Sequence, residues 1–387
     1  MKLTDRRKNK TRSRLDLYFS VLDYWILVPV LLVATIGLFV LNRVLSSGYD
    51  GNGHTMFIKQ AGAVMSGVMI AMILGALETP FLKIIAFIVY GSSVLLLVFV
   101  LVDSYSLVET TGADSWLRIP LIGSFQPSEL AKVGMIMLSS YFLADIKSGK
   151  ISKIRGLLIV GAIFAIPLEL IRRQPDLGTI LVIMFILFSM LYVYGLPYKY
   201  ILLASSGGIA LLPVVWAFIL KPHQKNRILT FLYPGFSPSQ AFHIEQAKIA
   251  IRAGGITGSN LDNTITVPVK ESDFIYTAVA EQLGFIGTTV LVLLIFTYIV
   301  RSLILSSGTT DPALKYMSAG IAVMFGIHSV ENLGMCVGIM PITGIPLPFV
   351  SLGGSSMIVN FFALGILLCI SIEQNMTRKL GSFEFLD

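Results

Sequence analysis

Two carboxylates flank the start of an apolar stretch, where they could carry out acid–base chemistry. Asp273 directly precedes the stretch. Glu281 lies eight residues after Asp273, about two helical turns farther along the same helix face. Asp273 could act as a general base at a membrane surface, with Glu281 lying deeper. Each also has a simpler explanation. Asp273 could cap the helix that follows it, and Glu281 could make a polar contact between helices.

Glu129 and Lys132 are spaced three residues apart and therefore share one face at the start of another apolar stretch. Ionisable groups inside a membrane are costly and are treated as functional candidates by default. The spacing supports two interpretations equally: a mutually neutralising pair, or a functional pair. Asp176 lies between two further apolar stretches, and by itself it is best explained as a helix cap.

Basic residues collect in one long polar segment: Lys221, Lys225, Arg227, Lys248, Arg252 and Lys270. A solvated loop surface explains them most simply, and an anionic lipid headgroup or a pyrophosphate is the more specific ligand. The glycine pair at 254–255 lacks the Lys-Ser/Thr ending of a nucleotide loop, so no nucleotide is expected. The four His have no metal-ligand spacing, and two Cys cannot form a disulfide framework.

The elements that position these residues are membrane-spanning helices. Of the 387 residues, 55% are hydrophobic and only 13% are charged, and the mean hydropathy is +0.80. A soluble domain carries about 25% charged residues. One crossing needs ~20 apolar residues, so the chain can cross about ten times. The composition excludes a soluble enzyme, a disordered chain and a single-anchor receptor, and it predicts an all-α polytopic membrane protein.

Apolar stretches place the ten helices at 24–45, 57–77, 80–102, 128–145, 156–171, 177–196, 199–220, 274–300, 315–335 and 352–372. The segment 1–23 is a basic arm, 24–372 is the transmembrane domain, and 373–387 is a tail. Because basic residues stay in the cytoplasm, the arm and the basic loop 146–155 predict cytoplasmic termini. The net charge is +7 and its densest basic cluster is that short arm, so no nucleic-acid partner is expected.

This topology places two long segments on the extracytoplasmic side of the membrane, 103–127 and 221–273. The second lies between helices 7 and 8 and contains a helix-compatible stretch at 239–252. A loop of that length usually folds and functions. Asp273 then lies at the outer membrane surface, where no ATP is present, so a reaction there must use an already activated substrate.

Five motifs resemble blocks of the SEDS family (shape, elongation, division and sporulation proteins, RodA/FtsW-like). They lie at 125–132 (FQPSELAK), 174–179 (QPDLGT), 226–234 (NRILTFLYP), 272–284 and 343–356 (TGIPLPFVSLGGSS). The resemblance covers nearly the whole chain, and residues 222–229 are similar to the elongation type. Where many relatives carry Arg before a Trp, this chain has Ser115 before Trp116.

The resemblance implies a peptidoglycan glycosyltransferase that polymerises lipid II at the outer face of the bacterial cytoplasmic membrane. It also implies a class B penicillin-binding protein as transpeptidase partner, together with other membrane proteins of an elongation or division complex. By the match of its motifs to those of the family, the resemblance implies that Asp273 is the catalytic residue. The implied substrate-binding residues are Glu129, Lys132, Arg227, Gln126, Asp176, Trp116 and Arg118.

The implied reaction is an inverting displacement of undecaprenyl pyrophosphate by a sugar hydroxyl. One carboxylate base and cationic groups suffice, because pyrophosphate leaves as an anion and needs no acid. We expect Asp273 to be the base, Lys132 and Arg227 to meet the pyrophosphate, and Glu129 to orient Lys132. A divalent cation, Mg or Mn, is a further candidate. The rival functions are a lipid II flippase and a non-catalytic scaffold for a transpeptidase.

Overall fold

The computed structural model describes residues 14–48, 52–102, 115–119, 123–174, 176–233, 235–259 and 265–384. Its elements in chain order are α1 (Arg14–Val21), α2 (Tyr24–Gly48), α3 (Gly53–Gly75), α4 (Pro80–Val102), β1 (Leu117–Ile119), β2 (Gly123–Phe125), α6 (Pro127–Lys147), α7 (Lys153–Arg173), α8 (Leu177–Tyr194), α9 (Tyr198–Val214) with a π-helical extension (Val215–Ile219), α10 (Pro222–Leu232), α11 (Pro238–Ala253), α12 (Ile275–Gly308), α13 (Pro312–Val337) and α14 (Gly354–Glu384).

Nine helices of the described residues are long and apolar enough to cross a membrane: α2, α3, α4, α7, α8, α9 with its extension, α12, α13 and α14. The tenth expected span corresponds to α6, whose Glu129 and Lys132 lower its hydropathy. Because α6 packs against α4, α7 and α13, its charges lie inside the bundle rather than against lipid. The predicted all-α polytopic fold is confirmed.

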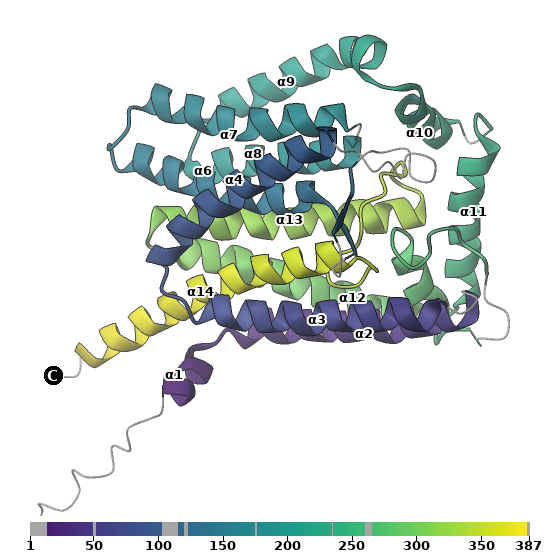
Figure 1. The fold of residues 1–387 in the computed structure, drawn as a ribbon, viewed down its shortest axis with the longest axis horizontal. Helices are drawn as coiled ribbons and strands as arrows, with labels where there is room; N and C mark the ends of the chain where they lie inside the picture. Colours follow the sequence, from purple (N-terminus) through teal and green to yellow (C-terminus); the bar gives the residue numbers. More distant parts are fainter. Residues whose placement is uncertain are drawn as a thin grey trace, which may run out of the picture.

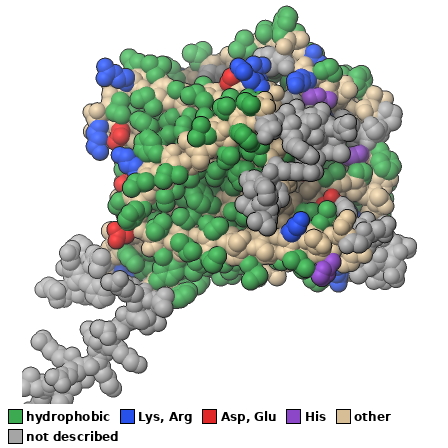
Figure 2. All heavy atoms as spheres, in the orientation of Figure 1, with side chains coloured by type: hydrophobic (Ala, Val, Ile, Leu, Met, Phe, Trp, Pro, Cys, Tyr) green, Lys and Arg blue, Asp and Glu red, His purple; other side chains and the backbone are tan. Residues whose placement is uncertain are grey.

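The outer surface of the bundle is apolar, as contact with lipid requires. Large hydrophobic side chains such as Phe87 and Leu95 of α4 and Leu158 of α7 are exposed. In Figure 2, hydrophobic side chains cover the middle of the visible face, and the charged ones gather toward its edges.

Several helices extend past the apolar stretches that predicted them. The span expected at 156–171 is the longer α7, and α14 continues through Glu384, well beyond the predicted end at 372. The short helix α1 lies within the predicted basic arm. Polar residues at these ends can stay helical outside the hydrocarbon, where apolar length no longer sets the boundary.

The long polar segment 221–273 folds at one end of the bundle. It contains α10 and α11, and α11 confirms the helix expected at 239–252. Figure 1 shows these two helices at the opposite end from α1 and the last turns of α14. We call the end that carries α10 and α11 the loop end. The short hairpin β1–β2, which pairs Leu117 with Phe125, was not expected in an all-helical chain.

A kink in α12 joins the loop segment to the bundle. Gly284 has φ +63°, a conformation that favours glycine, and a Cβ there would collide with the backbone of Gly258 and Ile256. The amide of Phe285 instead donates to the carbonyl of Gly255 at 2.9 Å, and that of Ile286 to the carbonyl of Ile256 at 3.1 Å. The loop therefore satisfies the amides that the kink frees from the helix ladder.

The predicted orientation of the bundle can be tested with reporter fusions. A reporter after Ser259, at the loop end, should read extracytoplasmic. Reporters at Ser152 and after the C-terminus should read cytoplasmic, because the basic segments remain inside. A cytoplasmic signal from the Ser259 fusion would overturn both the orientation and an outer-facing site.

Candidate active site

Asp273 lies at the loop end, one residue before the N-cap of α12. The N-cap is Phe274, and no side chain makes a capping hydrogen bond to this helix. The capping explanation of Asp273 is therefore wrong. Its partly exposed carboxylate accepts a hydrogen bond from the Ser272 hydroxyl at 3.2 Å, so it is available for other chemistry.

The C-terminal signature segment 343–356 packs around Asp273 and its neighbours. The Ser351 hydroxyl donates to the carbonyl of Ser272 at 2.6 Å, and the amide of Leu352 donates to the carbonyl of Glu271 at 2.9 Å. Gly344 has φ +75°, and a Cβ there would stand 3.3 Å from Oδ2 of Asp273. Glycine allows the turn and leaves room beside the carboxylate.

Arg227 of α10 also belongs to this group. Its Nη1 donates to the carbonyl of Thr343 at 3.3 Å, and its charge acts on Asp273. The predicted base and one predicted cation, forty-six positions apart in the sequence (273 − 227), thus belong to one site.

The surroundings of Asp273 raise its pKa from 3.8 to about 6. Desolvation by the packed loop is the main cause, and the nearby charge of Glu271 adds to it. The Ser272 hydroxyl and the charge of Arg227 act in the opposite direction but do not cancel the desolvation. The carboxylate is therefore a stronger base than an ordinary aspartate while remaining ionised at neutral pH.

Asn332 of α13, which the sequence reasoning did not single out, holds the backbone of Asp273. Its fully buried Nδ2 donates to the carbonyl of Asp273 at 2.7 Å and to that of Ile345 at 2.8 Å. One side chain thus ties the candidate base to the signature segment. An Asn within an apolar span was the available signal, because such residues are rarely without a partner.

Glu129 and Lys132 form a buried ion pair on α6, with 2.8 Å between Oε1 and Nζ. Lys132 is 1% exposed. Its Nζ also lies 2.7 Å from Nε2 of His328 on α13, a contact that links residues 196 positions apart. The neutralising pair that the spacing suggested is therefore present, and His328 is a further hydrogen-bond partner of Lys132.

Asp176 caps α8, as its position predicted. Its Oδ1 accepts from the amide of Thr179 at 3.0 Å, and its Oδ2 accepts from the Thr179 hydroxyl at 2.7 Å. The predicted substrate-binding residue Gln126 also donates to Oδ2 at 3.2 Å, so these two predicted residues lie together. Glu331 of α13 interacts electrostatically with both Lys132 and Asp176.

The remaining predicted residues are less closely tied to these groups. Trp116 is partly buried beside β1, and the side chain of Arg118 lies outside the described part of the structure. Ser115, which stands where many relatives have Arg, is buried, and its hydroxyl donates to the carbonyl of Gln174 at 3.5 Å.

Glu281 is a structural residue in this arrangement. It is fully buried, forms an ion pair with Lys270, and accepts from the amide of Ile265 at 2.7 Å. The polar contact expected for Glu281 is therefore present, made with the loop rather than with another helix. Lys270, one of the basic loop residues, is occupied by this pair.

Several buried polar atoms near the candidate residues have no hydrogen-bond partner in the described part of the chain: Ser128 Oγ, Gln174 Oε1, Glu331 Oε2 and Thr343 Oγ1. Buried polar groups are normally satisfied, so such a group points to water or a ligand. Ser128 and Gln174 belong to motifs that carry predicted site residues, and the carbonyl of Thr343 accepts from Arg227.

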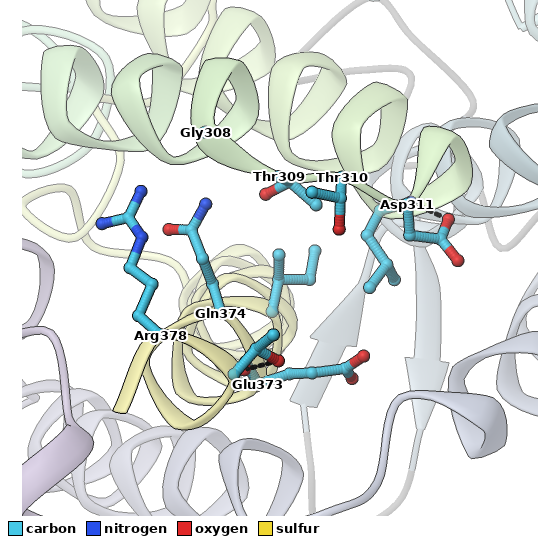
Figure 3. A pocket seen from close by; sticks show the side chains of 10 residues that line it. Gly308, Thr309, Thr310, Asp311, Glu373, Gln374 and Arg378 are labelled. Atoms are coloured by element: carbon cyan, nitrogen blue, oxygen red, sulfur yellow. Dashed lines mark hydrogen bonds between the residues drawn. The ribbon is translucent and has the colours of Figure 1, made fainter. Parts of the chain in front are cut away.

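A separate pocket of about 140 Å³ lies at the other end of the bundle, between the α12–α13 junction and α14. Figure 3 shows Glu373, Gln374 and Arg378 of α14 facing Thr309 and Thr310 across it. No predicted site residue lines it. It is therefore not the candidate active site.

Comparison with known proteins places these features in a family. Residues 22–376 match the family model FtsW/RodA/SpoVE, described as a cell cycle protein. The peptidoglycan glycosyltransferase MrdB of Escherichia coli strain K12 is 29% identical over 364 residues, which cover 91% of this chain and 95% of MrdB. A probable peptidoglycan glycosyltransferase FtsW of Trichlorobacter lovleyi is 34% identical over 295 residues, covering 75% of this chain and 76% of that protein.

Solved structures agree with the sequence matches. A chain from a peptidoglycan synthase complex that coordinates polymerization and crosslinking superposes with a TM-score of 0.77 at 28% identity, covering 91% of this chain and 98% of that one. The rod shape determining protein RodA of Thermus thermophilus superposes with a TM-score of 0.67 at 25% identity, covering 91% and 97%. The fold, the motifs and the family match lead to one conclusion: this chain is a multi-pass membrane protein that belongs to the FtsW/RodA/SpoVE (SEDS) family.

Proposed function

We propose that this protein is a peptidoglycan glycosyltransferase that polymerises lipid II, with Asp273 as the general base. The observation that carries the proposal is the environment of Asp273: a partly exposed carboxylate with a raised pKa, held by the family's own motifs at the loop end. The relatives MrdB and FtsW are named as enzymes of this class.

Asp273 would remove the proton from the attacking sugar hydroxyl as the new glycosidic bond forms and the bond to pyrophosphate breaks. A base works best when its pKa lies near the operating pH, and a pKa of about 6 meets that condition. Asn332 and the 343–356 segment fix the backbone of Asp273, which keeps the carboxylate in one place.

Arg227 is the cation that we propose for the leaving pyrophosphate, because it acts on the same carboxylate and belongs to a basic helix. The pKa of His223 on α10 is lowered mainly by burial and further by Arg227 and Lys221. This positive field would stabilise the negative charge that develops on the leaving group. Lys132, Glu129, Gln126, Asp176, Trp116 and Arg118 remain proposed substrate-binding residues.

A divalent cation, Mg or Mn, stays a prediction. The described residues contain no group of three or more His, Cys, Asp or Glu side chains that could hold a metal. Mg²⁺ is commonly bound by one or two carboxylates together with substrate phosphates, so a pyrophosphate would have to complete such a site. Removal of divalent ions with a chelator, followed by an activity measurement, tests the requirement.

We also propose that the loop end faces the outside of the bacterial cytoplasmic membrane, with both termini inside. The proposed partner is a class B penicillin-binding protein within an elongation or division complex. The matched chain comes from a peptidoglycan synthase complex that coordinates polymerization and crosslinking, and this supports such a partner. Co-purification with a single-span penicillin-binding protein tests the assignment.

One experiment separates the proposed enzyme from its rivals. The purified protein is given lipid II, and glycan polymer is measured in detergent while headgroup flipping is measured in liposomes. A glycosyltransferase makes glycan polymer in detergent, where no lipid bilayer is present. A flippase moves headgroups without making polymer, and a scaffold does neither, so either of those results would reject the proposal.

The pKa of Asp273 predicts how activity depends on pH. The base must be deprotonated, so kcat/KM should be constant above about pH 7 and fall about tenfold per unit below about pH 6. A pH–rate profile of lipid II polymerisation checks this, with helical content measured at each pH as a control. A folded enzyme whose kcat/KM is unchanged at pH 4.5 would contradict a base with this pKa.

A further inference from the structure

The buried group around Lys132 has one hydrogen-bond donor to spare. A lysine ammonium carries three N–H groups and no acceptor. Two are directed to Glu129 at 2.8 Å and to His328 at 2.7 Å, and no third partner occurs among the described residues. Because Lys132 is 1% exposed, bulk water cannot reach the third N–H freely.

The contact with Lys132 also fixes the state of His328. Lysine can only donate, so Nε2 of His328 must accept, and the ring proton must lie on Nδ1. A charged His328 would place two cations 2.7 Å apart inside the bundle. His328 is therefore a neutral acceptor that holds the ammonium toward α13.

Glu331, one turn along α13 from His328, has an acceptor to spare. It is 7% exposed, and its Oε2 has no hydrogen-bond partner in the described part of the chain. It interacts electrostatically with Lys132 but does not form an ion pair with it. A buried acceptor without a partner costs stability, so its presence calls for a ligand.

The charges around this group indicate which ligand fits. The ammonium of Lys132 is already paired with the carboxylate of Glu129 at 2.8 Å, and the nearby carboxyl groups of Glu331 and Asp176 act on each other, so this group is poorly suited to a second anion such as pyrophosphate. A metal ion lacks a group of three suitable ligands among the described residues. A hydroxyl is neutral and can both accept from Lys132 and donate to Glu331.

We propose that Lys132 and Glu331 form a buried subsite for a sugar hydroxyl of the lipid-linked substrate, with His328 holding Lys132 in place. The proposal rests on the function proposed above and names a substrate contact that its motifs do not assign. Hydroxyl recognition by paired polar groups gives strong discrimination, because a ligand without that hydroxyl leaves them unpaired. The sequence also led us to expect that Lys132 binds the pyrophosphate, and that role stays a prediction. The carboxyl groups near Lys132 favour a neutral hydroxyl over a pyrophosphate as its ligand.

The test compares two ligands that differ in the sugars. Lipid II carries the disaccharide, whereas undecaprenyl pyrophosphate carries only the lipid and the phosphates. Binding of each is measured in the Asp273→Asn background, which prevents turnover. Glu331→Met should weaken lipid II binding about tenfold or more, since a hydrogen bond to a charged group is lost. It should leave undecaprenyl pyrophosphate binding within about twofold, because the phosphates do not contact Glu331.

Thermal stability gives a second readout. Replacing a buried unpaired carboxylate with an apolar side chain of similar size should raise the melting temperature of the free protein. The expected combination is a more stable protein that binds lipid II less well. Glu331→Leu, which also lacks a hydrogen-bond acceptor, carries the binding test if the Met variant fails to fold.

Tyr141→Phe is the matched control. Tyr141 lies farther along α6, toward the other end of the bundle, and its buried hydroxyl also lacks a partner among the described residues. Its removal should change the binding of neither ligand.

Two results would overturn the subsite. One is unchanged lipid II binding in folded Glu331→Met or Glu331→Leu, which would leave water as the only ligand. The other is an equal loss for both ligands, which would indicate a general disturbance or a phosphate contact. Failure of the proposed function is distinct from both, because the unmodified protein would then make no polymer from lipid II.

Discussion

Asp273→Asn is expected to abolish most glycan polymerisation, by about 100-fold or more, while the protein folds normally. A positioned base contributes ~10²–10⁴-fold, and an amide cannot accept the proton of a sugar hydroxyl. The side chain does not cap α12, and its hydrogen-bond partner among the described residues is the Ser272 hydroxyl, from which an Asn oxygen can also accept. The measurement is the rate of lipid II polymerisation by purified protein at matched amounts.

Binding and a neighbouring carboxylate supply the controls for Asp273. Lipid II binding should survive in Asp273→Asn, since the base acts on the hydroxyl and does not hold the pyrophosphate. Asp273→Glu should also be impaired, because one added methylene displaces the carboxylate by more than a hydrogen bond tolerates. Glu271→Gln changes a carboxylate two positions away and should keep activity near that of the parent. Polymerisation by well-folded Asp273→Asn at close to the parent rate would show that the proposed mechanism is wrong.

Lys132→Met should cause the second large loss, in stability as well as activity. It leaves Glu129 as a buried carboxylate without its cation, and breaking a buried pair in this way costs about 3–5 kcal/mol. It also removes the donor that meets His328 and, in the proposed subsite, the substrate. The variant should unfold at lower temperature and polymerise lipid II at a small fraction of the parent rate.

The double variant Glu129→Gln/Lys132→Met separates stability from function. Removing both charges restores a neutral interior, so stability should recover toward that of the parent. Polymerisation should remain low if the ammonium binds substrate. The double variant, or a variant with the two residues swapped, could still polymerise lipid II at much of the parent rate. That result would show that Glu129 and Lys132 only neutralise each other.

The ion pair of Asp23 and Arg301, at the end of the bundle opposite the loops, provides the comparison for Lys132. Its Nε–Oδ2 distance is 2.8 Å, and the Asp23 side chain is 2% exposed. Arg301→Gln should therefore lower thermal stability, since it too leaves a buried carboxylate without its cation. It should keep polymerisation, because it lies far from the candidate residues. A parallel loss of activity in Arg301→Gln would mean that loss of stability alone explains Lys132→Met.

The apolar stretches determined the membrane architecture from the sequence. The thickness of hydrocarbon that a helix must cross is fixed, so each membrane-spanning helix requires a continuous run of apolar residues that is visible in the sequence. Local chemistry likewise predicted the cap formed by Asp176 and the pairing of Glu129 with Lys132, because both involve residues three positions apart. The family motifs identified Asp273 and Arg227 as candidates before their contacts were known.

Only the tertiary structure decided what surrounds these residues. Asp273 was consistent with a cap or a base, and packing of α13 and the 343–356 segment around its backbone removed the first choice. In the sequence, His328 and Glu331 are polar residues that interrupt an apolar span. In the structure, α13 brings His328 into contact with Lys132, and Glu331 interacts electrostatically with Lys132 and Asp176. Hydrogen bonds and burial depend on which helices are neighbours. A single sequence records the local periodicity of each helix but not the pairing between helices distant along the chain.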